Sequence, residues 1–401
     1  MKIVAINSCT YGSTGSIMQS IAQTAITHGH TAYIAFPDGR HRERNRLACR
    51  DLPAIPFSSR FSESFHLLAD RLTGFNGCFS VFSTAALLRK LDKLQPDLLH
   101  LHNLHNCYIN LPMLFRYIKK RHLRVVWTLH DCWAFTGHCP HFDGIGCDKW
   151  QTGCEHCPQY RRYPQSLVDR SKAMYRRKKN WFTGVEDLTI VTPSAWLAEL
   201  AERSFLGDYP IRVIPNGIDL SVFRPTGTNK ERRKDRFVIL GVAAAWSEAK
   251  GLDVYIELAK RLEDRFQIVL AGTDEEVDRK LPGNIISIRR TADPHKLAEL
   301  YTAADLFVNA TRQDNYPTVN LEALACGTPV LTFRTGGSPE AIDAECGMTV
   351  ERNDINALEQ AIRRIAEVSP FAPEACIRRA QEFAADHQFE KYVKLYEAGA
   401  T

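Results

Sequence analysis

Short apolar runs alternate with helical stretches along most of the chain. In the first half, runs rich in β-branched residues predict buried strands, and they fall at residues 2–7, 31–36, 97–102, 124–130 and 188–194. Helical stretches, such as residues 16–28, separate these runs. Strands that alternate with helices in this way form parallel sheets with helices on both faces.

A charged segment, residues 226–236, interrupts this pattern and is interpreted as a linker between domains. The alternation restarts after it, with strand-like runs at residues 237–244, 266–272, 285–288, 305–311 and 328–333. The pattern therefore predicts an α/β protein of two doubly wound, Rossmann-like domains, residues 1–218 and 219–385. Ligands of such sheets bind outside the carboxyl ends of the strands, so we expect the domains to face one interdomain cleft.

The end of the chain, residues 386–401, is predicted to form a separate helix. Four apolar side chains recur in it at helical spacing and give it one apolar face; they are Phe389, Tyr392, Val393 and Tyr396. We expect this helix to pack back across the first domain.

The composition, with 44% hydrophobic and 24% charged residues, is that of a soluble globular protein. The sequence has no apolar run long enough to span a bilayer, and its start lacks the apolar core of a signal peptide. We therefore expect a cytoplasmic protein whose thiols stay reduced.

Positive charge is concentrated in the first domain. Residues 1–218 contain 27 Lys and Arg against 17 Asp and Glu, whereas the remainder contains 24 against 29. Much of the excess lies in residues 116–124 and 161–179. Such stretches suit an anionic membrane surface or phosphates, and a basic face that is merely solvated is the alternative. No nucleic-acid recognition module accompanies the charge, so no nucleic-acid partner is expected.

Polar residues of the second half form the most specific pattern. Lys250 and Gly251 stand where a helix follows a strand, which is a natural diphosphate site by charge and by helix dipole. Asp314 precedes a turn into another helix, and Glu322, eight residues later, can hold a vicinal diol with its two carboxylate oxygens. Residues 335–342 supply a second Gly-rich turn into a helix, which also favours anions.

Four motifs carry a resemblance to a known family. They are NGID (216–219), KGLD (250–253), DNYPTVNLEALACGTPV (314–330) and GGSPE (336–340). In these motifs the chain resembles the retaining glycosyltransferases of family 4, which have the GT-B fold. The resemblance implies transfer of a sugar from a nucleotide-sugar donor, a UDP- or GDP-sugar, that the C-terminal domain mainly holds.

The resemblance also implies roles for residues of the second domain. Lys250 would neutralise the donor diphosphate, Glu322 would hold the ribose hydroxyls, and Asp314 with the following backbone amides would hold the donor sugar. The predicted donor-binding set is Gly12, Gly15, Lys250, Asp314, Asn315, Tyr316, Pro317, Thr318, Val319, Glu322, Gly336 and Gly337.

In the first domain, His130 ends a strand where family members often keep a histidine against the donor sugar. Asp131 is expected to orient His130 or its backbone. The family uses a Gly-rich turn such as that at Gly12 and Gly15 to admit the acceptor or a donor phosphate close to the backbone. Three further histidines lie near another strand end and suit acceptor contacts better than metal ligation; they are His100, His102 and His105.

The sequence departs from the family pattern at two positions. Asp314 stands where the family usually has Glu, so this shorter carboxylate must lie closer to the sugar. Ala245 stands where the family usually has an Arg that binds the second phosphate. Either Lys250 and helix N-termini suffice there, or a basic residue such as Arg312 or Arg289 substitutes.

Catalysis in such a site consists mainly of stabilising the leaving diphosphate and positioning the acceptor hydroxyl. The resemblance implies retention through front-face attack, with no catalytic divalent metal. The predicted catalytic residues are His130, Asp131, Lys250, Asp314 and Glu322.

Residues 138–158 form a cysteine-rich insertion, with Cys139, Cys147, Cys154 and Cys157 at spacing C-x7-C-x6-C-x2-C. Four thiolates in a reducing compartment suit a closed, structural zinc site. Disulfides and unpaired packing thiols are the alternatives. We interpret the insertion as a brace for the loop after Asp131.

The cysteine pattern also resembles that of colanic acid, capsule and O-antigen glycosyltransferases. This implies a lipid-linked glycan acceptor in surface polysaccharide biosynthesis and a peripheral position at the cytoplasmic face of the inner membrane. Two alternatives stay open at this point: a zinc-dependent binding or scaffold protein on a degenerate transferase fold, and a sugar-nucleotide epimerase of the same fold.

Overall fold

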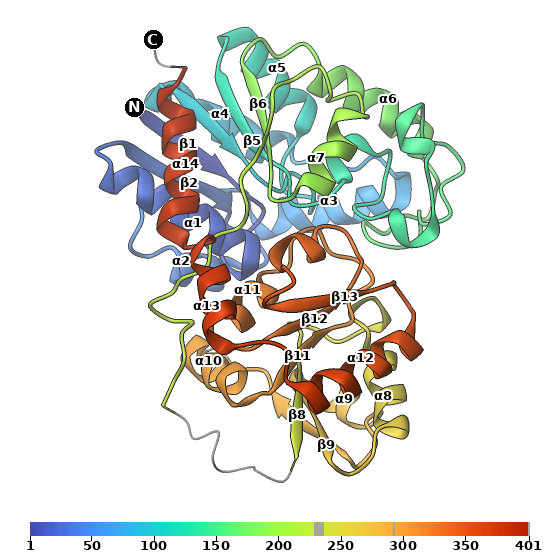
Figure 1. Ribbon diagram of the computed structural model, residues 1–401. Coiled ribbons are helices and arrows are strands. Elements are labelled where there is room, and N and C mark those ends of the chain that lie inside the picture. Colours follow the sequence, from blue (N-terminus) through green and yellow to red (C-terminus); the bar gives the residue numbers. More distant parts are fainter. Residues whose placement is uncertain (228–235, 292, 400–401) are drawn as a thin grey trace. The chain divides into compact units, whose positions relative to one another are not determined.

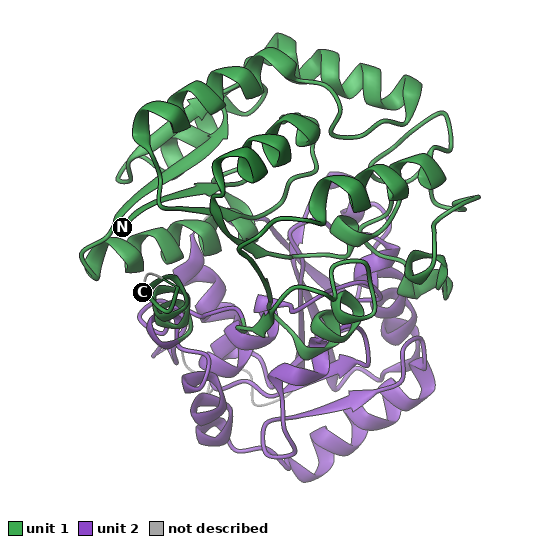
Figure 2. Cartoon of the chain, turned by 90° about the horizontal axis from the view of Figure 1, so that it is seen from above, with its two compact units in different colours: residues 1–215, 388–401 green, residues 216–387 purple. Residues whose placement is uncertain are grey.

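The computed structural model describes residues 1–227, 236–291 and 293–399. The chain forms two compact units, residues 1–215 with 388–401 (unit 1) and residues 216–387 (unit 2), as Figure 2 shows. The charged segment predicted as a linker, 226–236, therefore belongs to the range of unit 2, and its residues 228–235 lie outside the described part.

Unit 1 is built on a seven-stranded parallel sheet with strand order β3-β2-β1-β4-β5-β6-β7. Its strands are β1 (Lys2–Ile6), β2 (Thr31–Pro37), β3 (Ala54–Phe57), β4 (Leu98–Leu101), β5 (Arg124–Thr128), β6 (Leu188–Thr192) and β7 (Ile211–Val213). Its helices are α1 (Gly12–Thr27), α2 (Arg42–Ala48), α3 (Arg60–Thr73), α4 (Val81–Leu94), α5 (Leu111–Arg121), α6 (Ser171–Phe182) and α7 (Ala195–Glu202), and Figure 1 traces them.

The last helix, α14 (Ala385–Glu397), completes unit 1 from residue 388 onward. The guanidinium of Arg124 donates hydrogen bonds to the carbonyls of Leu395 and Tyr396 at its end. The Tyr396 hydroxyl lies 2.8 Å from Nδ1 of His100 on β4. These contacts hold α14 over the middle of the sheet and cover the buried histidine.

Unit 2 is built on a six-stranded parallel sheet with strand order β10-β9-β8-β11-β12-β13. Its strands are β8 (Phe237–Val242), β9 (Phe266–Thr273), β10 (Ile285–Arg289), β11 (Leu306–Asn309), β12 (Val330–Phe333) and β13 (Gly347–Val350). Its helices are α8 (Leu252–Arg261), α9 (Glu275–Asp278), α10 (Pro294–Ala303), α11 (Thr318–Ala325), α12 (Ile355–Val368) and α13 (Pro373–Gln381).

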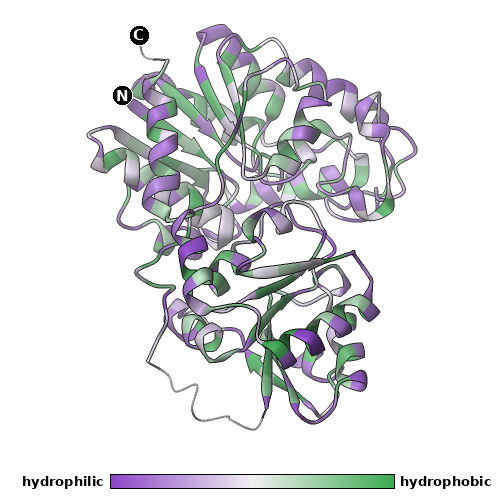
Figure 3. Ribbon diagram, in the orientation of Figure 1, coloured by the Kyte–Doolittle hydropathy of each residue, from purple (hydrophilic) through white to green (hydrophobic). Residues whose placement is uncertain are grey.

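The central strands are buried along their whole length. Every residue of β4, β11 and β12 is buried, as expected where helices cover both faces of a parallel sheet. Figure 3 shows the hydrophobic positions gathered on the strands of each sheet. The predicted class, two doubly wound parallel sheets, is confirmed. Helix α1 begins at Gly12, ahead of the predicted start at Ser16.

The strand order of each sheet reverses direction once. The reversal lies between β1 and β4 in unit 1 and between β8 and β11 in unit 2. Loops that leave the carboxyl ends of adjacent strands diverge at such a switch point and open a crevice for ligands. Gly12 follows β1, Lys250 follows β8 and Asp314 follows β11, which are strands at these switch points. His130 and Gly336 follow the next strands outward, β5 and β12. Among the described helices, none has the length and apolar character needed to cross a membrane.

Candidate functional site

In unit 2, Lys250 lies against the loop that follows β11. The chain leaves β8, forms a short 3-10 turn (Glu248–Lys250) and enters α8 through Gly251, whose φ is +78°. A Cβ at Gly251 would stand 2.4 Å from the carbonyl oxygen of Ala310, so the approach of these two loops requires glycine. This approach brings Nζ of Lys250 to 2.7 Å from Oδ2 of Asp314.

The turn from Asp314 to Pro317 is tied to two of the other motifs. The carbonyl of Asn315 accepts from the amide of Gly337 at 2.8 Å, and the carbonyl of Tyr316 accepts from Nδ2 of Asn216 at 3.1 Å. Helix α11 then begins at Thr318, and no side chain caps its N-terminus. An N-terminus without a capping side chain leaves amides that suit a negatively charged group.

Glu322 lies one turn into α11 and is partly buried. Its Oε2 accepts a hydrogen bond of 2.9 Å from the hydroxyl of Tyr301. Burial raises the pKa of the Glu322 carboxyl from its ordinary value, and the hydrogen bonds from Tyr301 and Thr318 counter part of that shift. The tyrosine fixes one carboxylate oxygen, as a residue that holds a ligand hydroxyl requires.

The Gly-rich turn after β12 presents buried hydroxyls. Oγ1 of Thr335 and Oγ of Ser338 are buried, and neither has a hydrogen-bond partner among the described residues. Asn320 of α11 donates to the carbonyl of Ser338 at 3.2 Å, which fixes this turn beside the α11 N-terminal half. Leaving buried polar groups unpaired costs free energy, so these hydroxyls suit a polar ligand. Gly336 and Gly337 form the same turn.

Ala245 stands where the family usually has an arginine. The two arginines considered as substitutes for it are both paired with carboxylates. Arg312 makes two hydrogen bonds of 2.7 Å to Asp253 on α8. Arg289 lies 3.0 Å from Asp278. Of the cations considered for the donor phosphates, Lys250 is therefore the one that the structure places with Asp314 at the switch point.

In unit 1, His130 follows β5 and is held by a second histidine. Its Nε2 lies 3.0 Å from Nδ1 of His102, which follows β4, and the two rings stack with centroids 5.3 Å apart. Burial lowers the pKa of His130 to about 4 and that of His102 well below its ordinary value. Both imidazoles are therefore neutral at pH 7, so His130 can offer a hydrogen bond and carries no charge.

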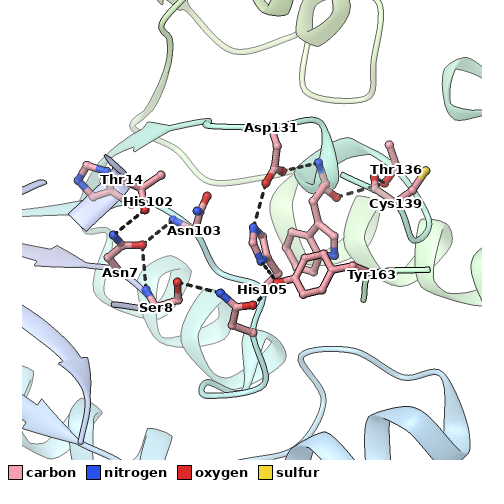
Figure 4. A network of polar contacts seen from close by, with 12 residues as sticks. Asn7, Ser8, Thr14, His102, Asn103, His105, Asp131, Thr136, Cys139 and Tyr163 are labelled. Atoms are coloured by element: carbon pink, nitrogen blue, oxygen red, sulfur yellow. Dashed lines mark hydrogen bonds and ion pairs between the residues drawn. The ribbon is translucent and has the colours of Figure 1, made fainter. Parts of the chain in front are cut away.

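Asp131 belongs to a different network, which Figure 4 shows. Its Oδ2 lies 3.0 Å from Nε2 of His105, and its Oδ1 accepts from the amide of Trp133 at 2.8 Å. Burial alone would raise the pKa of Asp131, but His105 and the other hydrogen bonds hold it at about 2. The sequence suggested that Asp131 orients His130; in the structure His102 holds the His130 ring, and Asp131 holds His105 and the start of the following loop.

The network reaches the segment after the cysteine-rich insertion through Tyr163. The hydroxyl of Tyr163 lies 2.7 Å from Nδ1 of His105 and also contacts the side-chain oxygen of Asn106. Asn106 donates to Oγ of Ser8 at 3.0 Å, after β1 (Figure 4). Polar side chains after β1, β4 and β5 thus converge at the switch point of unit 1.

The two glycines predicted near the acceptor lie at the start of α1. Gly12 has a φ of +72° and is the first residue of the helix. A Cβ at Gly15 would stand 2.3 Å from the backbone carbon of Thr10, so no other residue allows the helix to begin so close to the turn. Asn7, just before, accepts from the amides of Ser8 and Asn103 at 2.8 and 3.3 Å.

The four cysteines predicted to bind zinc line one cavity of about 20 Å³. Cys154 Sγ accepts from the amide of Gly137 at 3.1 Å, and a hydrogen bond from Cys139 lowers the pKa of the Cys157 thiol to about 7. Across the described part of the chain, however, no group of three or more His, Cys, Asp or Glu side chains is arranged to hold a metal ion. The structure therefore does not support the predicted zinc site.

Side-chain packing braces this loop instead. The rings of Phe135, Phe142 and Trp150 pack together, with Phe142 and Trp150 stacked at 4.9 Å. Nζ of the fully buried Lys178, on α6, donates to the carbonyls of Trp133 at 2.7 Å and Thr136 at 3.1 Å. The same ammonium lies 3.4 Å from the centroid of the Trp133 ring, so it fixes the loop that follows Asp131.

Comparison with protein families assigns both halves of the chain. The model described as "Glycosyltransferase Family 4" matches residues 15–222, and that described as "Glycosyl transferases group 1" matches residues 236–367. The chain belongs to glycosyltransferase family 4. This membership removes the scaffold and epimerase alternatives, and the enzyme is a glycosyltransferase.

Relatives and solved structures agree with this assignment. "Putative colanic acid biosynthesis glycosyl transferase WcaC" of Escherichia coli (strain K12) is 27% identical over 316 residues, which are 75% of this chain and 76% of that protein. Anabaena Alr3699/HepE in complex with UDP has a TM-score of 0.71 at 15% identity and covers 99% of this chain and 100% of its own. The sucrose-phosphate synthase of Thermosynechococcus elongatus has a TM-score of 0.70 at 18% identity and covers 99% and 98%. The transferase therefore has the GT-B fold.

Several residues of these networks had no clear sequence signal. Tyr163 and Lys178 lie in basic stretches that gave no reason to select either one. His102 and His105 are two of the three strand-end histidines that the sequence indicates, but their partners, His130 and Asp131, can be assigned only from the structure.

The buried histidines predict that acid destabilises the transferase. Burial lowers the pKa of five histidines of unit 1, to about 3 for His66 and His100 and about 4 for His130 and His138, with His102 also well below its ordinary value. The unfolded chain then binds more protons than the folded one below pH 6.5. As the pH falls below 6.5, each such histidine lowers the free energy of unfolding by up to about 1.4 kcal/mol per pH unit.

Urea unfolding between pH 7 and 4.5 measures this slope. We expect the free energy of unfolding to decrease steadily as the pH is lowered. The decrease should be less steep in His102→Gln. It should keep the slope of the parent protein in His295→Gln, whose side chain is exposed. A free energy that does not change with pH would contradict the neutral histidine cluster.

Lys178 predicts that the free energy of unfolding also rises with pH in the alkaline range. Burial lowers its pKa to about 7, so above that pH the folded protein has released a proton that the unfolded chain still binds. The free energy of unfolding, which burial of the charged lysine lowers at neutral pH, therefore increases as the pH rises from 7 to 9.5. In Lys178→Met this rise should be smaller than in the parent, whereas Lys179→Met, an exposed neighbour, should keep it. Equal slopes in both variants would show that Lys178 is charged in the folded state.

Proposed function

We propose that the transferase moves a sugar, with retention of its anomeric configuration, from a UDP- or GDP-sugar to a lipid-linked oligosaccharide in surface polysaccharide biosynthesis. Unit 2 holds the donor and unit 1 the acceptor. The enzyme acts as a peripheral protein at the cytoplasmic face of the membrane. Structural zinc forms no part of this proposal, because the described residues do not fit it.

The observation that carries the proposal is the arrangement around the switch point of unit 2. Segments joined by hydrogen bonds bring four features together there. They are the Lys250–Asp314 pair, the α11 N-terminus without a capping side chain, the Glu322 carboxylate fixed by Tyr301, and two buried hydroxyls without partners among the described residues. These are the groups that a diphosphate, a ribose and a hexose require. HepE, which shares the fold, has been solved with UDP and with UDP-glucose.

The Lys250–Asp314 pair suggests how the donor enters. With no donor bound, each charge neutralises the other at 2.7 Å. A donor diphosphate at the α11 N-terminus offers Lys250 a doubly charged partner, and Asp314 is then released to accept a hydroxyl of the donor sugar. Lys250 and the helix amides stabilise the negative charge that develops on the leaving diphosphate. Glu322 holds the ribose through its remaining carboxylate oxygen.

The roles of unit 1 follow from the protonation of its residues. His130 is neutral and held by His102, so it supplies a hydrogen bond to the transferred sugar and cannot act as a general acid at pH 7. Asp131 stays ionised and keeps the loop after β5 in place through His105 and Trp133. The proton of the acceptor hydroxyl passes to the departing phosphate, as in front-face transfer.

The acceptor class and the location rest on two further observations. The relative WcaC is named for colanic acid biosynthesis, and residues 1–218 carry an excess of ten basic over acidic side chains. A basic surface attracts anionic lipid headgroups and the phosphates of lipid-linked sugars.

Calorimetric titration with UDP, GDP, UDP-glucose and GDP-mannose tests the donor site. We expect at least one nucleotide series to bind, and Lys250→Ala to weaken that binding about tenfold or more, since it removes the cation from the diphosphate. Glu322→Ala should weaken it through the ribose. Lys260→Ala, an exposed lysine on α8, the helix that follows Lys250, is the matched control and should bind like the parent. Failure of all four nucleotides to bind would refute the assignment.

Turnover of the donor found in that titration tests His130. His130→Ala should lower kcat/KM by about a hundredfold, in the range seen when one preorganised hydrogen bond is removed. His130→Gln should retain more activity, because an amide can still donate. Since the pKa of His130 is about 4, kcat/KM should show no step from this residue between pH 5.5 and 8. A step that disappears in His130→Gln would assign an acid–base role instead.

A further inference from the structure

Helix α3, light blue in Figure 1, is buried on its polar side and exposed on its apolar side. Glu63, His66 and Asp70 face the interior, with exposed fractions of 4%, 0% and 3%. A row spaced three to four residues apart faces outward; Phe61, Phe65, Leu68 and Leu72 are 81%, 55%, 57% and 53% exposed. A surface helix of a globular protein normally has the reverse arrangement.

Specific contacts fix α3 in this rotation. Glu63 accepts from the amide of Arg40 at 2.9 Å. Nδ1 of His66 lies 2.7 Å from Oγ of Ser80. Asp70 accepts from Asn76 at 2.6 Å. Each of the three polar side chains makes at least one hydrogen bond inside unit 1, so the helix cannot turn its apolar row inward without breaking these bonds. The row is therefore a built feature of the surface.

The apolar row continues onto two neighbouring segments. The amide of Leu167, which is 63% exposed, donates to the carbonyl of Arg71 at 2.8 Å. At the other end Ser83 donates to Ser62 at 2.8 Å, and the preceding residue, Phe82, is 90% exposed. We call this surface the α3 apolar face; it consists of Phe61, Phe65, Leu68, Leu72, Phe82 and Leu167.

A cationic cavity of about 490 Å³ adjoins the same helix. Its lining includes Leu67, Asp70 and Arg71 of α3, together with Arg40 and Arg161. Arg40 is partnered by Glu63 at 3.8 Å, whereas neither Arg71 nor Arg161 has a carboxylate partner in the described part of the chain. Burial raises the pKa of Asp70, and hydrogen bonds from Asn76 and Cys107 counter part of that shift.

The cavity also reaches the network at the switch point of unit 1. Asn106 and Tyr163 line it, and the hydroxyl of Tyr163 lies 2.7 Å from His105, which in turn contacts Asp131. An anion held by the arginines would therefore be connected to the loop that carries His130 through two side chains, Tyr163 and His105. The arginine guanidinium is the side chain best suited to bind phosphate oxygens in pairs.

We propose that this cavity binds the diphosphate of the acceptor and that the α3 apolar face holds the hydrocarbon chain joined to it. The occupant is a polyprenyl-type lipid diphosphate at a bilayer surface, since a cationic cavity and an exposed apolar row on the same helix match an anionic group that is covalently joined to an apolar chain. This inference rests on the proposed function and names where its acceptor binds.

Binding of two soluble probes separates the two parts of the site. Farnesyl diphosphate, below its aggregation limit, and inorganic diphosphate are titrated by calorimetry into the full chain. Saturating UDP or GDP, whichever binds to unit 2, is present so that any phosphate site of unit 2 is occupied. We expect farnesyl diphosphate to bind at least tenfold more tightly than inorganic diphosphate.

Variants of each part should act differently. Arg71→Gln with Arg161→Gln should weaken both probes about tenfold or more. Phe61→Ser with Leu68→Ser and Leu72→Ser should reduce farnesyl diphosphate to the affinity of inorganic diphosphate and leave the latter unchanged. Arg116→Gln and Val368→Ser, an exposed arginine and an exposed valine elsewhere, are the matched controls and should bind both probes like the parent.

Each other outcome overturns the inference. Unchanged binding in the arginine variant would remove the cavity as the site. Equal affinity for farnesyl diphosphate and inorganic diphosphate would show that the cavity binds free phosphate groups, and it would contradict the proposed lipid. The substituted side chains are exposed, and circular dichroism with UDP binding on the same samples verifies that both units are folded. These experiments measure binding and not sugar transfer. A wrong donor assignment would therefore appear in the nucleotide titration, and a wrong acceptor site would appear in the titration of the two diphosphate probes.

Discussion

Parallel strands end in one direction, and this constraint places the Lys250, Asp314 and His130 loops at the carboxyl edges of the two sheets. The strand order reverses between β1 and β4 and between β8 and β11, so the loops there diverge and leave their polar groups without a covering strand. The Lys250–Asp314 pair and the His102–His130 pair lie at these two places. The sheet determines where chemistry can occur, and the loops determine which chemistry.

The two sites meet the cost of buried polar groups in different ways. In unit 2 two opposite charges are paired, and the hydroxyls of Thr335 and Ser338 stay without partners among the described residues, so a ligand gains by binding there. In unit 1 the polar side chains hydrogen-bond mainly to one another, and Lys178 with packed aromatic rings fixes the loop that they share. Nε2 of His102 and Nε1 of Trp133 have no partner among the described residues. The first arrangement suits a tightly bound donor, and the second a rigid surface that meets an acceptor.

The sequence predicted the sheets because buried parallel strands are continuous apolar runs, and it predicted the Lys250 and Asp314 loops because their motifs are local. It failed where the signal depends on distant contacts. The clustered cysteines predicted zinc, yet Cys139 hydrogen-bonds to Cys157, Cys154 accepts from a backbone amide, and the described residues form no group arranged to hold a metal ion. The partners of His102 and the reversed burial of α3 arise from residues far away in the chain, which no periodicity reveals.

The central claim, that unit 2 binds a nucleotide sugar at its switch point, is tested most directly by amide hydrogen exchange with and without the nucleotide. The account predicts slower exchange on binding in three segments of unit 2, residues 248–254, 314–322 and 335–340, with the largest change at the start of α11. Protection confined to other segments, or to unit 1 alone, would contradict it.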